Sequence, residues 1–292
     1  MYDIEHYYKA QSVSDAVRRL SESTDARLIA GGTDVLIQLH HMNKKFRNLV
    51  DIHGLPELCG ISQLDDGSIR IGSGSTFTQI IEAALVKRYL PSLGQAVANI
   101  AGPQVRNEAT FGGNICNGAN CADSAPISIV LGAQIEIATP DCTRFTPLES
   151  FYTGPGKVAL AHNEVAVAFH FKPADFEGVG ASFYKYAMRG AMDISTINCG
   201  AACRIEAGRF TMLKLAYGVA APTPIRAKAA EAAALGQPFN AVTLAAVREA
   251  VVQDVAPRTS WRASKEFRMQ IIRTLAERVV AQAVKNAGGT LA

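Results

Sequence analysis

The chain has 292 residues, of which 48% are hydrophobic and 19% charged, and its formal net charge is +3. This is the composition of a soluble globular protein with one large or two ordinary domains, and so small a charge gives no argument for a nucleic-acid partner. No apolar run reaches the eighteen or so residues of a membrane span, and the acidic residues 1–5 do not resemble a signal peptide, so we expect neither a membrane nor an export signal.

The six cysteines give no sign of a metal cluster or a redox disulfide. None forms a Cys-x-x-Cys pair, and no histidine stands at zinc-finger spacing. Cys116 and Cys121 come nearest to a pair. We expect both to be small, reduced residues, which is typical of a cytoplasmic protein.

Strands and helices alternate in the first half of the chain, which predicts an α/β or α+β arrangement. We expect an edge strand over residues 3–8, a helix that begins near Ser12, a strand over 26–30, a short helix over 35–39 and a strand over 48–51.

Residues 61–64 and 69–71 predict a β-hairpin across an Asp-Asp-Gly turn. The Gly-x-Gly of residues 72–77 lacks the third glycine of a dinucleotide fingerprint, and we interpret it as a turn from strand to helix. Helices are then expected over 78–85 and 92–99.

Two segments with paired glycines dominate the sequence, Ala30-Gly31-Gly32-Thr33-Asp34 and Ala109-Thr110-Phe111-Gly112-Gly113-Asn114. Paired glycines let a backbone turn through positive φ and approach a bulky ligand closely. Backbone N–H groups that point at one spot hold phosphate without a charged side chain. One pair alone is typical of an ordinary turn, but two pairs after strand-like residues predict a dinucleotide whose diphosphate lies between them.

Asp123 opens an apolar helix that runs to residue 131, either as its N-cap or as an acceptor for a ribose hydroxyl, and the two roles are compatible. Strands are expected over 134–139 and 164–171. Residues 172–178 shift to Pro, Gly and charge, so we place a domain boundary there, between 1–176 and 177–292.

The second part predicts three strands, over residues 181–188, 196–205 and 209–217, and Pro222 and Pro224 are expected to end their sheet. Helical periodicity follows, and the expected helices cover 227–235, 242–253 and 264–286. A three-stranded antiparallel sheet with three helices on one face is the natural packing.

Four motifs follow one another along the chain. They are Ala30-Gly31-Gly32-Thr33-Asp34, Thr110-Phe111-Gly112-Gly113-Asn114-Ile115, Asp123-x-x-Pro126, and Lys185-x-x-x-Arg189-x-x-x-Asp193-Ile194. Over essentially its whole length the chain resembles the FAD-binding subunits of molybdenum hydroxylases, the group of xanthine dehydrogenase and carbon monoxide dehydrogenase, and most of all the bacterial xanthine dehydrogenase type.

The resemblance implies an α+β protein: a two-subdomain FAD-binding domain of the vanillyl-alcohol-oxidase and CO-dehydrogenase-flavoprotein type, then the small sheet-and-helices domain. It implies that FAD is bound non-covalently. A molybdopterin-binding chain would oxidise a purine, and the electrons would reach the FAD through iron–sulfur clusters on a partner chain. The flavin would then transfer hydride to NAD. No catalytic residue and no metal ligand is expected in this chain. The FAD contacts it implies are Arg27, Leu28, Ile29, Ala30, Gly31, Gly32, Thr33, Asp34, Ala109, Thr110, Phe111, Gly112, Gly113, Asn114, Asp123, the backbone near Val165, Tyr184 and Lys185.

Some points stay open at this stage. Lys185, Arg189 and Asp193 either tune the flavin or form an ordinary ion-pair network. Phe111 replaces a smaller aliphatic residue of the family and is expected to crowd the isoalloxazine or change its environment. Bulky replacement of Gly32 or Gly113 is expected to remove FAD while leaving the fold intact.

Three other functions remain as alternatives. The subunit could pass electrons to a quinone or another acceptor instead of NAD. It could be a self-sufficient flavin oxidase or reductase, or a non-catalytic assembly subunit whose glycine segments bind nothing.

Overall fold

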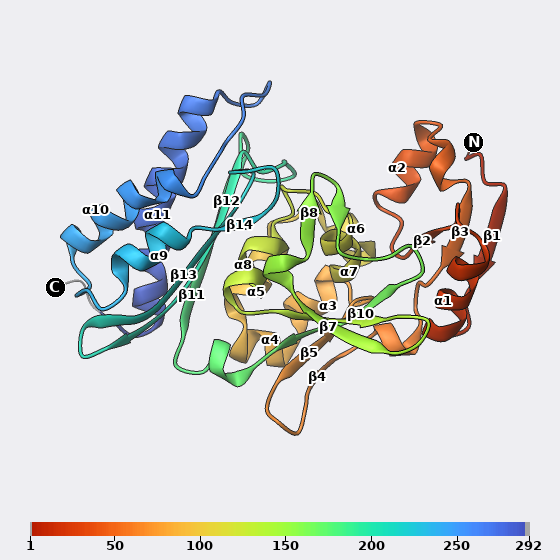
Figure 1. Cartoon of the computed structure of the whole chain (residues 1–292), viewed down its shortest axis with the longest axis horizontal. Helices are drawn as coiled ribbons and strands as arrows, with labels where there is room; N and C mark the ends of the chain where they lie inside the picture. Colours follow the sequence, from red (N-terminus) through yellow and green to blue (C-terminus); the bar gives the residue numbers. More distant parts are fainter. Residues whose placement is uncertain (1, 290–292) are drawn as a thin grey trace.

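The N-terminal end of the protein is a small parallel sheet with the strand order β1-β3-β2. The computed structural model describes residues 2–289, and Figure 1 shows this sheet at one end of an elongated molecule. Its elements are β1 (His6–Lys9), α1 (Val13–Glu22), β2 (Arg27–Ile29), α2 (Val35–His40), the 3-10 turn η1 (Lys44–Phe46) and β3 (Asn48–Asp51). The predicted order of elements is confirmed here, and the Ser12 side chain caps α1 by accepting a hydrogen bond from the Asp15 N–H.

The central sheet is antiparallel and has the strand order β4-β5-β10-β6-β7. Its middle strand carries an almost continuous apolar sequence, and six of its seven residues are buried, because protein covers both faces. The predicted hairpin of β4 and β5 is confirmed. The strands are β4 (Ile61–Gln63), β5 (Ile69–Gly72), β6 (Gln134–Ala138), β7 (Thr143–Pro147) and β10 (Val165–Phe171).

Short helices cover one face of this sheet and α1 packs on the other. Phe169 and Phe171 belong to the larger core with the helices, whereas Val165 and Val167 pack in the cluster under α1. The helices are α3 (Phe77–Glu82), α4 (Ala84–Tyr89), α5 (Pro91–Ala98), α6 (Pro103–Glu108), α7 (Phe111–Cys116) and α8 (Ser124–Val130). The β5–α3 turn forms as expected from the Gly-x-Gly sequence, with Thr76 and Gln79 making a reciprocal capping box.

The C-terminal part is an antiparallel sheet with α9, α10 and α11 on one face and α5 and α8 on the other (Figure 1). Gly200 lies so close to α8 that an added β-carbon would be 2.9 Å from backbone atoms of Ile127. The sheet therefore rests directly on the first part of the chain. Its elements are β11 (Gly180–Tyr186), β12 (Ile197–Glu206), β13 (Arg209–Gly218), β14 (Ile225–Arg226), α9 (Lys228–Ala234), α10 (Ala241–Ala250) and α11 (Lys265–Asn286).

The structure differs from the predicted elements in three places. The sheet does not end at Pro222 and Pro224, because β14 follows them and pairs with Ala216 and Tyr217 as a fourth strand. The helix expected over 78–85 is divided at Ala83, which has an extended backbone. Strands β7, β8 (Tyr152–Gly154) and β9 (Lys157–Val158) were not predicted, since edge strands such as β7 bury none of their residues and show no apolar pattern.

Four further 3-10 turns complete the described chain: η2 (Pro56–Leu58), η3 (Leu148–Ser150), η4 (Pro173–Asp175) and η5 (Val251–Gln253). The turn η4 lies at the boundary predicted between 1–176 and 177–292, and that boundary stays a prediction. Among residues 2–289, no helix combines the length and the apolar character that crossing a membrane requires.

Candidate functional site

The first glycine segment is a cradle of backbone donors between β2 and α2. Gly32 has φ of +72°, a left-handed conformation that glycine adopts without strain. Within the described residues, the N–H groups of Gly31, Gly32, Thr33 and Asp34 donate no hydrogen bond to a backbone carbonyl. Successive free N–H groups around a left-handed residue form an anion-binding concavity. This segment therefore has the geometry predicted for it.

The second glycine segment has a different structure from the one predicted. Gly112 and Gly113 do not have positive φ; they form the first turn of α7, which Thr110 caps by accepting a hydrogen bond from the Gly113 N–H at 3.1 Å. The Phe111 and Gly112 N–H groups donate to the carbonyls of Ser75 and Ser73. The donors of this turn are thus already used within the protein. A Thr at the N-cap position is compatible with a helix start, and the long-range hydrogen bonds to Ser73 and Ser75 hold the turn in this conformation.

The two segments are in direct contact, and the expectation that a diphosphate lies between them stays a prediction. A β-carbon added to Gly31 would lie 1.8 Å from the carbonyl oxygen of Glu108 and 3.2 Å from the Cα of Ala109. One added to Gly112 would lie 2.6 Å from the Cβ of Ser73. These glycines permit close packing of backbone on backbone. The second segment thus forms the wall against which the cradle of the first segment is held.

Several predicted contact residues turn their side chains away from this cradle. Phe111 is completely buried, and its ring packs on Phe169 at 4.4 Å between centroids, so the expectation that it crowds the isoalloxazine is wrong. Val165 is also completely buried, in the cluster under α1. The Arg27 guanidinium donates to the carbonyl of Ala26 and contacts the ring of His162. The buried side chains of Phe111 and Val165 are therefore not available to contact FAD, and a contact of Arg27 with FAD stays a prediction.

The remaining residues of the two segments lie close to the cradle. Ile29 ends β2, and its side chain lies 3.6 Å from the position of a β-carbon on Gly32. The carboxyl of Asp34 has solvent access, yet the protein around it desolvates it enough to raise its pKa. Asn114 accepts a hydrogen bond from the Ser124 hydroxyl at 2.6 Å, which connects α7 to α8. The others are Leu28, Ala30, Thr33 and Ala109, all partly or wholly covered by neighbouring residues.

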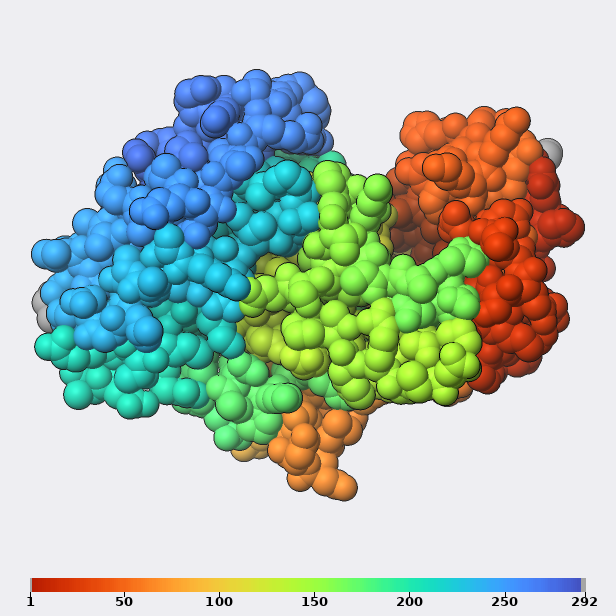
Figure 2. Space-filling model, in the orientation of Figure 1, coloured from red at the N-terminus to blue at the C-terminus, as the bar shows by residue number. Residues whose placement is uncertain are grey.

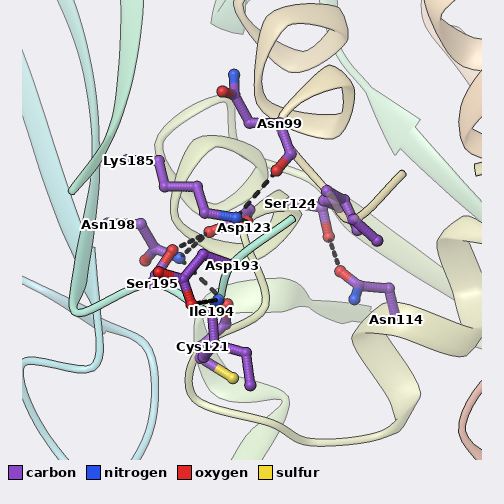
Figure 3. A network of polar contacts seen from close by, with 12 residues as sticks. Asn99, Asn114, Cys121, Asp123, Ser124, Lys185, Asp193, Ile194, Ser195 and Asn198 are labelled. Atoms are coloured by element: carbon purple, nitrogen blue, oxygen red, sulfur yellow. Dashed lines mark hydrogen bonds and ion pairs between the residues drawn. The ribbon is translucent and has the colours of Figure 1, made fainter. Parts of the chain in front are cut away.

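Asp123 and Lys185 form a buried ion pair at the junction between the two parts of the chain (Figure 3). The Lys185 Nζ lies 2.7 Å from Oδ2 of Asp123 and donates a second hydrogen bond to the carbonyl of Asn99. Oδ1 of Asp123 accepts from the Ser195 hydroxyl at 2.5 Å and from Asn198 Nδ2 at 2.6 Å. Asp123 occupies the N-cap position of α8, but its side chain does not cap the helix. Its predicted contact with a ribose stays a prediction.

Sequence reasoning missed three members of this network. Asn99 contributes only a carbonyl, while Ser195 and Asn198 lie around the start of β12. Nothing in the local sequence marks them, because their role follows from how β12 packs beside α8. Of the two alternatives for Lys185, Arg189 and Asp193, the ion-pair network is found only in part, because Lys185 pairs with Asp123 instead. A role toward the flavin stays a prediction.

Arg189 and Asp193 form a separate surface pair. Their nearest charged atoms are 4.0 Å apart, and 69% of the Arg189 side chain is exposed. Asp193 also accepts hydrogen bonds from the backbone N–H groups of Met188, Arg189 and Ile194. It therefore shapes its own loop. Tyr184, next to Lys185 on β11, is 45% exposed.

The cysteines near the site are unreactive. Burial raises the pKa of Cys116 to about 12, and burial together with the charge of Asp123 raises that of Cys121. A thiol with a raised pKa stays protonated and is a poor nucleophile and a poor metal ligand. Within residues 2–289, no group of three or more His, Cys, Asp or Glu side chains is placed to hold a metal ion.

The backbone donors of the cradle lie beside a hollow in the surface. Figure 2 shows the surface hollowed between the orange lobe that carries α2 and the rest of the molecule, and Figure 1 places β2, α6 and α7 beside this hollow. The cradle offers neutral backbone donors without a basic side chain, which suits the diphosphate of FAD. The residues present therefore fit FAD.

Comparison with known proteins agrees with this geometry. Residues 2–172 match the model of the FAD binding domain in molybdopterin dehydrogenase, and residues 182–283 match that of the CO dehydrogenase flavoprotein C-terminal domain. A xanthine dehydrogenase FAD-binding subunit of Escherichia coli O157:H7 is 55% identical over 291 residues, which cover 100% of both chains. The carbon monoxide dehydrogenase medium chain of Hydrogenophaga pseudoflava is 28% identical, over 94% of this chain and 95% of its own.

Solved structures show the same architecture. A chain of carbon monoxide dehydrogenase from Hydrogenophaga pseudoflava superposes with a TM-score of 0.93 at 29% identity and covers 98% of this chain and 99% of its own. A chain of quinoline 2-oxidoreductase from Pseudomonas putida 86 has the same fold, with a TM-score of 0.91 at 24% identity and the same coverage of both chains.

Proposed function

The chain belongs to the family of FAD-binding domains in molybdopterin dehydrogenases, and from this premise we propose that it is the FAD-binding subunit of a xanthine dehydrogenase-type molybdenum hydroxylase. Its proposed partners are an iron–sulfur subunit and a molybdopterin-binding subunit, in a complex of three kinds of chain in the cytoplasm. The complex would oxidise a purine in purine catabolism or salvage, and this subunit would reduce NAD. The 55% identity to a xanthine dehydrogenase FAD-binding subunit supports this assignment over other members of the family.

The observation that carries the proposal is the cradle of free N–H groups at Gly31, Gly32, Thr33 and Asp34. It lies against Glu108 and Ala109, where only glycine at residue 31 allows the contact. A row of unused donors fixed by such packing is preorganised for a diphosphate, since no rearrangement is needed when the ligand binds.

When bound, FAD supplies the redox chemistry, namely the acceptance of electrons and the donation of hydride to an acceptor. The chain's own residues bind and orient it. The cradle holds the diphosphate by hydrogen bonds, and the buried pair of Asp123 and Lys185 fixes the position of β11 against α8. Hydride transfer needs no side chain to move a proton, so no catalytic residue is assigned.

The experiment that tests the proposal is turnover of the complex co-purified with this chain. Xanthine is supplied anaerobically with NAD alone, with an artificial dye alone, or with neither. Purine-dependent formation of NADH at a rate comparable to dye reduction supports the NAD-linked function. Reduction of the dye without NADH formation would instead support another electron acceptor, which the likeness to the carbon monoxide dehydrogenase medium chain makes the second candidate.

The purified chain itself separates the remaining alternatives. A flavin spectrum that NADH bleaches, without any response to xanthine alone, supports a subunit that depends on partners. Bleaching by xanthine alone would show a self-sufficient enzyme. Absence of flavin after gentle purification and failure to take up added FAD would leave only an assembly role.

A further inference from the structure

The loop between η5 and α11, together with the first turn of α11, carries a group of positive charges without acidic partners. Arg258, Arg262 and Arg268 make no ion pair with any carboxylate among residues 2–289, whereas Arg226 and Arg248 of the same domain each pair with glutamates. We call these three residues the arginine cluster. Like charges brought together without counter-charges repel one another, so a bound anion would lower the electrostatic energy of the cluster.

Arg268 shows that the cluster is built into the fold. Its side chain is only 2% exposed and donates hydrogen bonds to the carbonyl of Thr196 and to the Ser260 hydroxyl, while its Nε has no partner. Burial and the charges of Arg258 and Arg262 lower its pKa. A buried cation without a counter-ion is costly, and an anion bound beside it would relieve that cost.

The same loop presents an aromatic surface. Trp261 is the sole tryptophan of the chain, and it is 77% exposed. The guanidinium of Arg262 lies 4.2 Å from the centroid of its ring. A large exposed aromatic ring next to cations is a stacking surface for a flat heterocycle that also carries negative charge.

Arg258 also lines a cavity of about 450 Å³. Its other walls include Asn120 from the α7–α8 connection, Pro155 and Gly156 from the turn between β8 and β9, and Pro222 from the C-terminal part. This volume lies in the ordinary range of small-molecule sites. Through Arg258, the arginine cluster therefore reaches the wall of a space of suitable size for a nucleotide.

Hydrogen bonds connect the cluster to the junction that carries Asp123. Arg268 holds the carbonyl of Thr196, and the neighbouring Ser195 donates to Asp123 at 2.5 Å. The positive charge of Arg262 also acts on the Cys121 thiol, two residues from Asp123. The cluster is thus connected to the segments that hold the buried ion pair of Asp123 and Lys185.

We infer that the cavity, the arginine cluster and Trp261 together bind the adenosine diphosphate half of the dinucleotide electron acceptor. The guanidinium groups of Arg258 and Arg262 hold its phosphates, and Trp261 stacks on its adenine. This inference rests on the proposed function, because it assumes that the acceptor is a dinucleotide. It adds where this acceptor binds and which residues select it.

The single tryptophan provides a direct readout that needs no turnover. The full chain loaded with FAD is titrated with oxidised NAD, ADP-ribose or inorganic phosphate while tryptophan fluorescence is followed. Saturable quenching by NAD and ADP-ribose, but not by phosphate at equal concentration, is expected. No change in tryptophan fluorescence with either nucleotide, or equal quenching by phosphate, would overturn the inference.

Substitutions then assign the response to the cluster. Arg258→Ala and Arg262→Ala are each expected to weaken ADP-ribose binding by about tenfold or more, as for loss of a charged hydrogen bond. The matched control is Arg248→Ala, which removes the same charge from α10, where Arg248 pairs with glutamates. Unchanged affinity in both cluster variants would refute the inference, and so would loss of bound FAD from them, since the cluster would then belong to the FAD site.

Turnover of the complex separates this inference from the proposed function. Both variants are expected to raise KM for NAD about tenfold with little change in kcat, and to leave turnover with an artificial dye unchanged. If the wild-type complex reduces NAD but the variants behave like Arg248→Ala, the function stands and the site is wrong. If the wild-type complex does not reduce NAD, the proposed function fails, and the fluorescence titration alone decides whether the cluster binds nucleotide.

Discussion

Replacing Gly31 with alanine should release FAD while leaving most of the fold intact. The added β-carbon would lie 1.8 Å from the carbonyl oxygen of Glu108, whereas ordinary contact begins near 3.4 Å. The segments that carry these residues must therefore separate by about 1.6 Å. Both atoms belong to the backbone, so no side-chain rotation can relieve the clash.

The expected cost follows from this geometry. Overpacking of this kind costs about 1–3 kcal/mol. In the FAD-free Gly31→Ala variant, the segments that carry residues 31 and 108 can separate to relieve the clash. A bound diphosphate, in contrast, requires the cradle in its original position. Most of the cost should then appear as weaker FAD binding, by a factor of about 5 to 150.

The assay is FAD content by visible absorbance after gel filtration, followed by titration of the FAD-free protein with FAD. The control is Gly113→Ala, where the nearest atom is the Thr110 hydroxyl oxygen at 2.9 Å, so that the clash is with a side chain and its cost is at most the loss of the Thr110 cap, about 1 kcal/mol. Alanine is also favoured over glycine in a helix by about 1 kcal/mol, so this variant should keep its FAD. The reasoning is refuted if Gly31→Ala binds FAD as the wild type does, or if Gly113→Ala loses as much affinity.

Other substitutions test the remaining conclusions. Lys185→Met should lower the free energy of unfolding by about 3–5 kcal/mol, because it leaves the buried charge of Asp123 without its ion-pair partner. Denaturant unfolding measures this free energy, and a loss below about 1 kcal/mol would contradict a buried ion pair. Phe111→Ala should destabilise the protein by about 3–5 kcal/mol but leave the flavin absorption maximum unchanged, and a shifted maximum would show that the ring touches the flavin after all. His170 and Arg70 hold the pKa of Glu136 below its ordinary 4.5. This carboxylate therefore stabilises the fold above that pH, and the stabilisation is lost as the pH falls through the lowered pKa. Glu136→Gln should make acid unfolding less steep, and an unchanged acid-unfolding profile would argue against the interaction of Glu136 with His170 and Arg70.

Much of the fold could be predicted from local sequence. The Ser12 cap, the hairpin of β4 and β5 and the helical periodicity of α11 each appear in the structure at or near the expected residues. Each depends on interactions between residues close in sequence, or on a strong apolar period, and both signals can be read from one chain. Weak edge strands such as β7 and β14 could not be predicted, because neighbouring strands and not their own residues determine them.

The candidate site was predicted only in part. The sequence by itself indicated the cradle at Gly31 and Gly32, since glycine adopts without strain the positive φ that Gly32 has there. Only the tertiary structure decided that Gly112 lies in a helix turn with its N–H already used, and that Phe111 faces the core. Only it brought Lys185 to Asp123 and placed the arginine cluster beside the cavity. These contacts join residues far apart in the chain, so their partners are fixed by the packing of sheets and helices and not by any local pattern.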